Sequence, residues 1–123
     1  MIGEPAKQFR PFMDMSATNG LRVLCAASGV SEEAPCRAEL DGSAYAVFKL
    51  DAAYYVLADA CTHGPGQLSE GAVIDDEIEC PFHQGRFNIK TGQPMLPPCT
   101  EAVRAWTAFV VDGRVCIDPT EQR

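Results

Sequence analysis

Two short segments of this 123-residue chain each pair one cysteine with one histidine. The first, C-T-H, occupies residues 61–63, and the second, C-P-F-H, occupies residues 80–83. The chain has only two histidines, so both of them lie in these segments. Thiolate sulfur and imidazole nitrogen are ligands of soft and borderline transition metals, which makes a metal centre the expected chemistry. The candidate ligands are Cys61, His63, Cys80 and His83.

Two kinds of metal centre accept two sulfur and two nitrogen ligands. One is a tetrahedral Zn²⁺ ion, and the other is a [2Fe–2S] cluster in which two cysteines bind one iron and two histidines bind the other. Zinc ligand pairs usually lie two to four residues apart, and the C-x-H pair is tight for a single ion. In the cluster each segment must contact both irons, and the short offsets of both pairs suit that arrangement. The spacing therefore favours the cluster, with a Cys2His2 zinc site as the alternative.

The residues around both segments resemble those of Rieske-type ferredoxins, the small electron carriers of bacterial multicomponent ring-hydroxylating oxygenases. The resemblance covers roughly residues 21–118. Besides the two Cys-His segments it includes Thr91-Gly92, Pro97-Pro98 and the closing stretch 111–115. It implies one Rieske [2Fe–2S] cluster as the cofactor.

The resemblance also assigns the ligands. It implies that Cys61 and Cys80 hold the inner iron of the cluster. His63 and His83 then hold the outer, solvent-facing iron. The proline-rich loop around residues 97–98 is expected to cover the cluster as a third loop.

A carrier of this family is not an enzyme, and it implies two partners. A flavin-containing, NAD(P)H-dependent ferredoxin reductase would supply one electron, and a terminal oxygenase that hydroxylates an aromatic ring would take it. The chain is too poor in histidine to be the oxygenase itself, which needs a further iron with two histidines and a carboxylate. It also lacks a G-x-G-x-x-G segment that would indicate the reductase. The remaining alternative is a Rieske-like small subunit of another redox enzyme, such as nitrite reductase.

Departures from respiratory Rieske proteins predict a low reduction potential. Those proteins carry an extra cysteine in each loop, and the two form a disulfide beside the cluster. The matching residues here are Gly66 and Phe82, and Phe87 replaces a tyrosine whose hydroxyl donates toward sulfur. With fewer hydrogen-bond donors near the sulfurs and a net charge of −7, the electron that reduction adds to the cluster is stabilised less. We expect a potential of roughly −150 mV rather than +300 mV.

The pattern outside the ligand segments is typical of an all-β protein. Short apolar or alternating runs predict strands at residues 21–25, 36–40, 44–50, 54–58, 106–111 and 114–117. Asp41-Gly42 and Asp112-Gly113 are typical of two-residue hairpin turns. We expect a Rieske-type antiparallel sandwich or barrel over residues 21–118, with a turn-rich cluster-binding subdomain at about 59–99. Residues 1–20 would form an N-terminal arm and residues 119–123 a C-terminal tail.

Composition restricts the partners and the compartment. The chain is 46% hydrophobic and 22% charged, as in globular proteins, and its net charge of −7 disfavours nucleic acid. No apolar stretch is long enough to span a membrane, and the first residues do not form a secretory signal. We therefore expect a cytoplasmic monomer.

Two groups of residues have no assigned role. In a reducing compartment the remaining cysteines are expected to be small buried apolar residues, and they are Cys25, Cys36, Cys99 and Cys116. An acidic loop between residues 70 and 79 is either a solvated surface or a docking patch for basic partners. Its acids are Glu70, Asp75, Asp76, Glu77 and Glu79.

Overall fold

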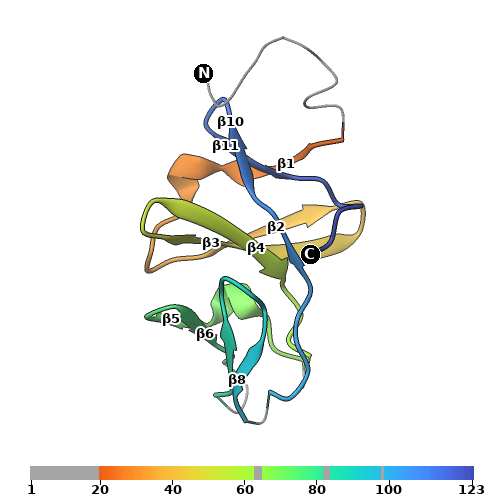
Figure 1. Cartoon of the computed structure of the whole chain (residues 1–123). Coiled ribbons are helices and arrows are strands. Elements are labelled where there is room, and N and C mark those ends of the chain that lie inside the picture. The colour runs from red at the N-terminus through yellow and green to blue at the C-terminus, as the bar shows by residue number, and fades with distance from the viewer. Residues whose placement is uncertain (1–19, 63–64, 82–83, 98) are drawn as a thin grey trace.

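The computed structural model describes residues 20–62, 65–81, 84–97 and 99–123, which fold into three small antiparallel sheets (Figure 1). Within these residues, helical structure is limited to two single 3-10 turns, η2 (Ala27–Gly29) and η3 (Leu68–Glu70). The expected all-β fold is thereby confirmed. Apart from Gly20, the expected N-terminal arm lies outside the described residues. In the described part of the chain, no helix is long and apolar enough to cross a membrane.

Three groups of strands make up the sheets. The first sheet has the order β1-β11-β10 and is formed by β1 (Arg22–Ala26), β11 (Arg114–Ile117) and β10 (Phe109–Val111). The second has the order β2-β3-β4-β9 and is formed by β2 (Cys36–Leu40), β3 (Ser43–Leu50), β4 (Ala53–Ala58) and β9 (Ala105–Trp106). The third has the order β5-β6-β7-β8 and is formed by β5 (Ala72–Ile74), β6 (Glu77–Glu79), β7 (Arg86–Asn88) and β8 (Pro94–Leu96).

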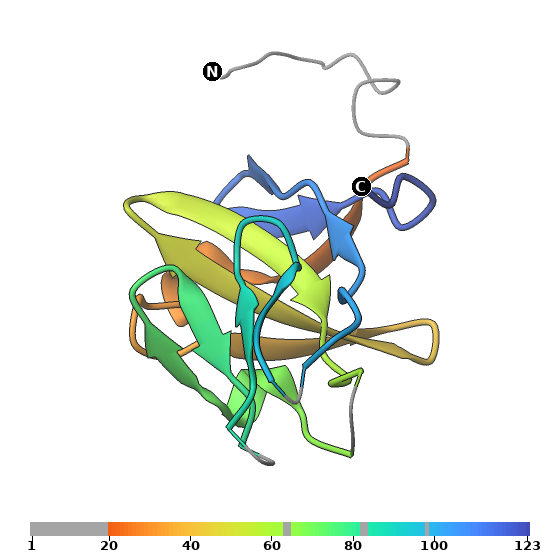
Figure 2. The ribbon, with the colours of Figure 1, turned by 60° about the horizontal axis from the view of Figure 1, so that its bottom comes forward.

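The second sheet lies between the other two, and both of its faces are buried (Figures 1 and 2). Successive side chains of a strand point to opposite faces. Ala46, Phe48 and Leu50 of β3 therefore pack toward the third sheet. Tyr45 and Val47 pack toward the first sheet. The alternation predicted from the sequence is confirmed, and each half of it contributes to a separate core.

Two-residue turns close the main hairpins as predicted. Asp41 and Gly42 have φ values of 52° and 85°, and Asp112 and Gly113 have values of 52° and 74°. Positive φ at both central residues matches the right-handed twist of the flanking strands. The β3–β4 turn uses the same region, but its second residue is Ala52, with a φ of 68°. This left-handed conformation is sterically unfavourable for alanine, because its Cβ comes too close to the following carbonyl oxygen.

The prediction of a single strand over residues 106–111 is wrong, because the chain passes from the second sheet to the first sheet within this stretch. β9 ends at Trp106, which pairs with Val56 in the second sheet. β10 begins at Phe109, which pairs with Cys116 in the first sheet. The Trp106 indole donates a hydrogen bond of 3.2 Å to the carbonyl of Pro119, and the amide of Arg123 donates to Ala105. Residues of the expected C-terminal tail thus pair with β9.

The expected burial of the four remaining cysteines holds for two of them. Cys99 and Cys116 are buried, whereas Cys25 and Cys36 are half-buried at the edge of the core between the first two sheets. The pKa of Cys25 is raised to about 12, mainly because the thiol is partly buried and next because the Cys36 thiol is nearby. This thiol therefore stays protonated at neutral pH.

Candidate metal centre

The first ligand loop joins β4 to η3, and its two ends are paired. Ala60 and Gln67 form an antiparallel bridge. Inside it, the amide of Cys61 donates a hydrogen bond of 2.9 Å to the carbonyl of Gly66. The Cys61 backbone is thereby fixed at the first position of a tight loop.

The second ligand loop joins β6 to β7 and is closed in the same way. Glu79 pairs with Arg86 at the ends of these strands. The amide of Cys80 donates a hydrogen bond of 2.8 Å to the carbonyl of Gly85. In both loops the first residue is a cysteine, and its amide donates to the glycine five residues later.

The structure brings two of the four predicted ligands into one buried cluster. Cys61 and Cys80 belong to the core between the second and third sheets, and Cys80 is fully buried. His63 and His83 lie outside the described residues. Among the residues that are described, no group of three or more His, Cys, Asp or Glu side chains could hold a metal ion. Two buried thiols on matching loops fit the sulfur-bound half of a [2Fe–2S] centre.

A third buried cysteine, Cys99, lies in the same core cluster. Both Cys61 and Cys80 are close enough to influence the pKa of the Cys99 thiol. Burial raises the pKa of the Cys99 thiol, and the hydrogen bond with Cys61 works in the opposite direction. The sequence analysis assigned Cys99 no role at the centre, although it expected the neighbouring loop around residues 97–98 to cover the cluster.

The loop that follows β8 packs against the second ligand loop. A Cβ added at Gly85 would overlap with Sγ of Cys99 and would lie 3.1 Å from its backbone nitrogen and 3.2 Å from the carbonyl oxygen of Leu96. Only a residue without a side chain fits between these atoms. Pro98, which the sequence places in the proposed covering loop, lies outside the described residues.

Asp59 positions the first ligand loop, and the sequence analysis missed it. Its carboxylate is almost fully buried, accepting a hydrogen bond of 2.7 Å from the amide of Ser69 and one of 3.1 Å from Nε of Arg37. The backbone carbonyl of Asp59 also accepts a hydrogen bond of 2.7 Å from the amide of Leu68. An acid directly after an apolar strand and two residues before a candidate ligand was the available signal.

Several acids of the loop at residues 70–79 face basic side chains. Glu77 and Glu79 each lie 3.6 Å from the guanidinium of Arg86, and Asp76 lies 3.6 Å from the ammonium of Lys90. These contacts partly neutralise the loop. The acidic loop is thus a weaker candidate for a docking patch than its composition indicates.

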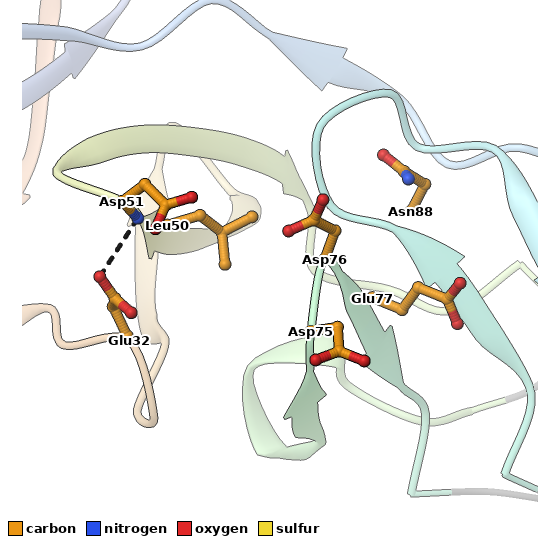
Figure 3. Close-up of a pocket in the computed structure, with 7 residues that line it drawn as sticks. All are labelled: Glu32, Leu50, Asp51, Asp75, Asp76, Glu77 and Asn88. Atoms are coloured by element: carbon orange, nitrogen blue, oxygen red, sulfur yellow. Dashed lines mark hydrogen bonds between the residues drawn. The ribbon is translucent and has the colours of Figure 1, made fainter.

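An open cavity of about 530 Å³ lies beside this loop (Figure 3). It separates the β3–β4 turn at Asp51 from the β5–β6 turn at Asp75 and Asp76. Glu32 accepts a hydrogen bond of 3.1 Å from the amide of Asp51 at one side. The β5–β6 turn is at the opposite end of its hairpin from Cys80, so the cavity is not part of the candidate metal centre.

Comparison with known proteins identifies the family. The Rieske [2Fe–2S] domain family matches residues 21–107. Ferredoxin CarAc of Metapseudomonas resinovorans is 40% identical over 95 residues, which are 76% of this chain and 89% of that protein. The anthranilate 1,2-dioxygenase ferredoxin subunit of Burkholderia cepacia is 40% identical over 85 residues, covering 69% of this chain and 79% of the subunit.

Solved structures agree with this result. The Sphingomonas yanoikuyae B1 ferredoxin is 35% identical and superposes with a TM-score of 0.77, covering 79% of this chain and 96% of that one. A nitrite reductase small subunit is only 22% identical with a TM-score of 0.69, which shows a shared fold and no more. The zinc alternative has no support among these relatives. The chain belongs to the Rieske [2Fe–2S] domain family, and its cofactor is a Rieske-type [2Fe–2S] cluster.

Proposed function

We propose that this protein carries single electrons within a multicomponent aromatic-ring-hydroxylating oxygenase system. It receives them from a flavin-containing, NAD(P)H-dependent reductase and delivers them to a terminal oxygenase. The observation that carries the proposal is the pair of matching loops, which hold Cys61 and Cys80 in one buried cluster. Relatives that are 40% identical are named as a ferredoxin and as the ferredoxin subunit of a dioxygenase.

The proposed ligands divide into a buried pair and a histidine pair. Cys61 and Cys80 hold one iron, and their burial keeps water from the sulfur ligands. His63 and His83 hold the other iron. When bound, the cluster takes up and releases one electron. The protein itself then needs no catalytic residue, because its work is to bind the cluster and to meet its partners.

Partner recognition is proposed to be brief and aided by charge. A solved relative with 36% identity is described as a complex of reduced oxygenase and oxidised ferredoxin in carbazole 1,9a-dioxygenase. Contacts between redox partners are usually small and short-lived. With a net charge of −7, this chain would associate faster with partner surfaces that are basic. We propose a cytoplasmic monomer that visits both partners in turn.

A reconstitution experiment tests the electron-carrier role. The purified holoprotein is combined with a ferredoxin reductase and oxygenases of the relatives' classes, and NADH-dependent hydroxylation is measured with and without it. We expect product only when the chain is present. If the protein purifies without iron and acid-labile sulfide after expression with ample iron, the proposal is wrong.

A variant series tests the ligand assignment. Cys61→Ser, Cys80→Ser, His63→Ala and His83→Ala are each expected to abolish the Rieske EPR signal. Cys116→Ser is the matched control, because Cys116 is buried on the other side of the second sheet and should leave the signal intact. A histidine variant with an unchanged EPR spectrum contradicts that ligand assignment.

A further inference from the structure

Two cysteines outside the candidate metal centre lie at the edge of the core between the first and second sheets. Cys25 is on β1 and Cys36 is on β2, and both are half-buried. β1 and β2 are each an edge strand of their sheet. Both side chains pack against the same core cluster, which is separate from the cluster that contains Cys61 and Cys80. The chemistry of this pair is therefore independent of the metal centre.

Strand pairing fixes the direction in which each of these cysteines points. Directly opposite residues of an antiparallel pair have their side chains on the same face of the sheet. Cys25 is opposite Val115, which is fully buried in the core between the two sheets. Cys36 is opposite Val47, which is fully buried in the same core. Cys25 thus points from the first sheet toward the second, and Cys36 points from the second sheet toward the first.

The two strands also approach each other closely. Cα atoms of β1 and β2 come within 8 Å of one another, whereas packed sheets usually lie about 10 Å apart. A disulfide needs Cα atoms no more than about 7 Å apart and side chains directed at each other. Cys36 is also close enough to influence the pKa of the Cys25 thiol. The directions of the side chains and the approach of the strands together suit a bond between the two sulfurs.

Cys116 also lies near Cys25, but its side chain has the wrong direction for a bond. Its neighbours along β11, Val115 and Ile117, are both buried in the core between the first two sheets. Successive side chains of a strand point to opposite faces, so Cys116 points away from that core. Cys36 is therefore the partner that the fold offers to Cys25.

We propose that Cys25 and Cys36 are a redox modification site, at which a peroxide converts the two thiols into a reversible disulfide that joins the first sheet to the second. The sulfur of Cys36 attacks a peroxide oxygen, the O–O bond breaks, and one water leaves as Cys36 becomes a sulfenic acid. The sulfur of Cys25 then attacks the sulfenic sulfur, so that the S–S bond forms, the S–O bond breaks and a second water leaves. Two thiols and one hydrogen peroxide thus give one disulfide and two waters.

The environment of the two thiols sets the order of these steps. The thiolate is the nucleophilic form of cysteine, and Cys25, with a pKa of about 12, stays protonated at neutral pH. Cys36 is partly open to solvent, and its thiol makes a long contact of 3.7 Å with the carbonyl of Arg37. Cys36 therefore meets the peroxide first. In a reducing compartment such a disulfide is transient, because thiol exchange restores the two cysteines.

Peptide mapping tests the bond directly. Trypsin cleaves after Arg22 and Arg37, so residues 23–37 form one peptide with Cys25 and Cys36 as its two cysteines. The purified holoprotein is treated with hydrogen peroxide, quenched with acid, alkylated in denaturant and digested, and the peptide is weighed by mass spectrometry. We expect a peptide that is two hydrogens lighter and unalkylated, and that takes two alkyl groups after treatment with dithiothreitol. A doubly alkylated peptide, or a cross-link to the peptide that contains Cys116, overturns the inference.

Variants test the role of each thiol. Cys25→Ser leaves Cys36 without a partner, so a sulfenic acid should accumulate at residue 36 and be captured by dimedone. Cys36→Ser should leave Cys25 mostly reduced at the same dose of peroxide. Cys116→Ser is the matched control, and its peptide 23–37 should form the disulfide as in the wild-type protein. Equal capture by dimedone at residues 25 and 36 would contradict the order of the two steps.

Thermal unfolding tests whether the bond joins the sheets. The midpoint of the peroxide-treated protein is measured before and after reduction with dithiothreitol, so that any damage to the cluster is common to both samples. The midpoint should be higher before reduction, because the bond restricts the unfolded chain, and Cys25→Ser should show no such difference. Equal midpoints overturn the proposed link between the sheets. The absence of a Rieske EPR signal from untreated protein would overturn the proposed function instead, and would leave this result unaffected.

Discussion

The carboxylate of Asp59 accepts a hydrogen bond of 2.7 Å from the backbone amide of Ser69. This contact joins the chain just before the first ligand loop to the chain just after it. The second carboxylate oxygen accepts a hydrogen bond of 3.1 Å from Nε of Arg37, which connects Asp59 to β2. A single buried acid thus connects the second sheet to both ends of the loop that contains Cys61.

Asp59→Ala is expected to lower the free energy of unfolding by about 2 kcal/mol, because the partly buried Ser69 amide and the Arg37 guanidinium lose their buried acceptor. The iron content of the purified protein should fall as well. Urea unfolding and iron analysis measure the two effects. Asp41→Asn is the control, since the Asp41–Arg22 pair is exposed at 2.9 Å and such pairs contribute little. Equal stability losses in both variants would contradict the anchoring role.

Ala52→Gly is expected to stabilise the protein by about 1 kcal/mol. The φ of 68° at Ala52 is costly for a residue with a Cβ and costs glycine little. Ala53→Gly is the matched control, because residue 53 begins β4 and glycine weakens strands. Denaturant midpoints of the two variants should move in opposite directions, and a fall in both would refute the strain argument.

Local residue patterns were sufficient to predict much of this fold. Asp-Gly pairs placed two hairpin turns, and alternation in residues 44–50 placed β3 with its two faces. The two cysteines of the ligand segments also proved to share one buried cluster. These features depend on neighbouring residues, and local sequence records them directly.

Features that depend on distant residues were missed. The break between Trp106 and Phe109 arises because these residues pair with different sheets, which no local pattern specifies. The contact of Cys99 with Cys61 likewise joins loops that are far apart in sequence. An isolated acid such as Asp59 looks like an ordinary turn residue until its distant partner Arg37 is known.

Gly85→Ala is expected to prevent normal loading of the cluster. The added methyl group would overlap with Sγ of Cys99 and crowd the carbonyl of Leu96, so the second ligand loop would have to move. Gly29→Ala serves as the control, because nothing lies within 4 Å of the position that its Cβ would take. Visible absorbance and acid-labile sulfide measure loading; full loading of Gly85→Ala would show that the loop tolerates the change.

The midpoint potential of the wild-type protein is expected near the low end of the Rieske range, at about −150 mV. Phe87 offers no hydroxyl, and the Thr62 hydroxyl is bonded to Glu101, so strong donors to sulfur are missing at these two positions. The negative net charge opposes the added electron further. Protein-film voltammetry gives the value directly, and a midpoint above zero would contradict this reasoning.

Added salt is expected to slow electron delivery to the oxygenase several-fold where association limits the rate. The net charge of −7 would steer the protein toward basic partner surfaces, and salt screens such attraction. Stopped-flow oxidation of the reduced protein measures the rate, with its visible spectrum at each salt concentration as the control for integrity. A rate that does not respond to salt would argue against steering by charge.

Burial of both faces of β3 has a consequence for how its pairing is specified. In a sheet with one solvent-exposed face, shifting a strand by one residue would expose its apolar side chains to water. The cost of that exposure fixes the register of the strand. In β3 such a shift would exchange one group of mostly apolar side chains for another, so the polarity of the side chains distinguishes poorly between the two registers. The two-residue turns at Asp41-Gly42 and Asp51-Ala52 must then set the alignment by geometry. Lengthening either turn by one residue should yield a mixture of misaligned folds rather than a uniformly weakened one.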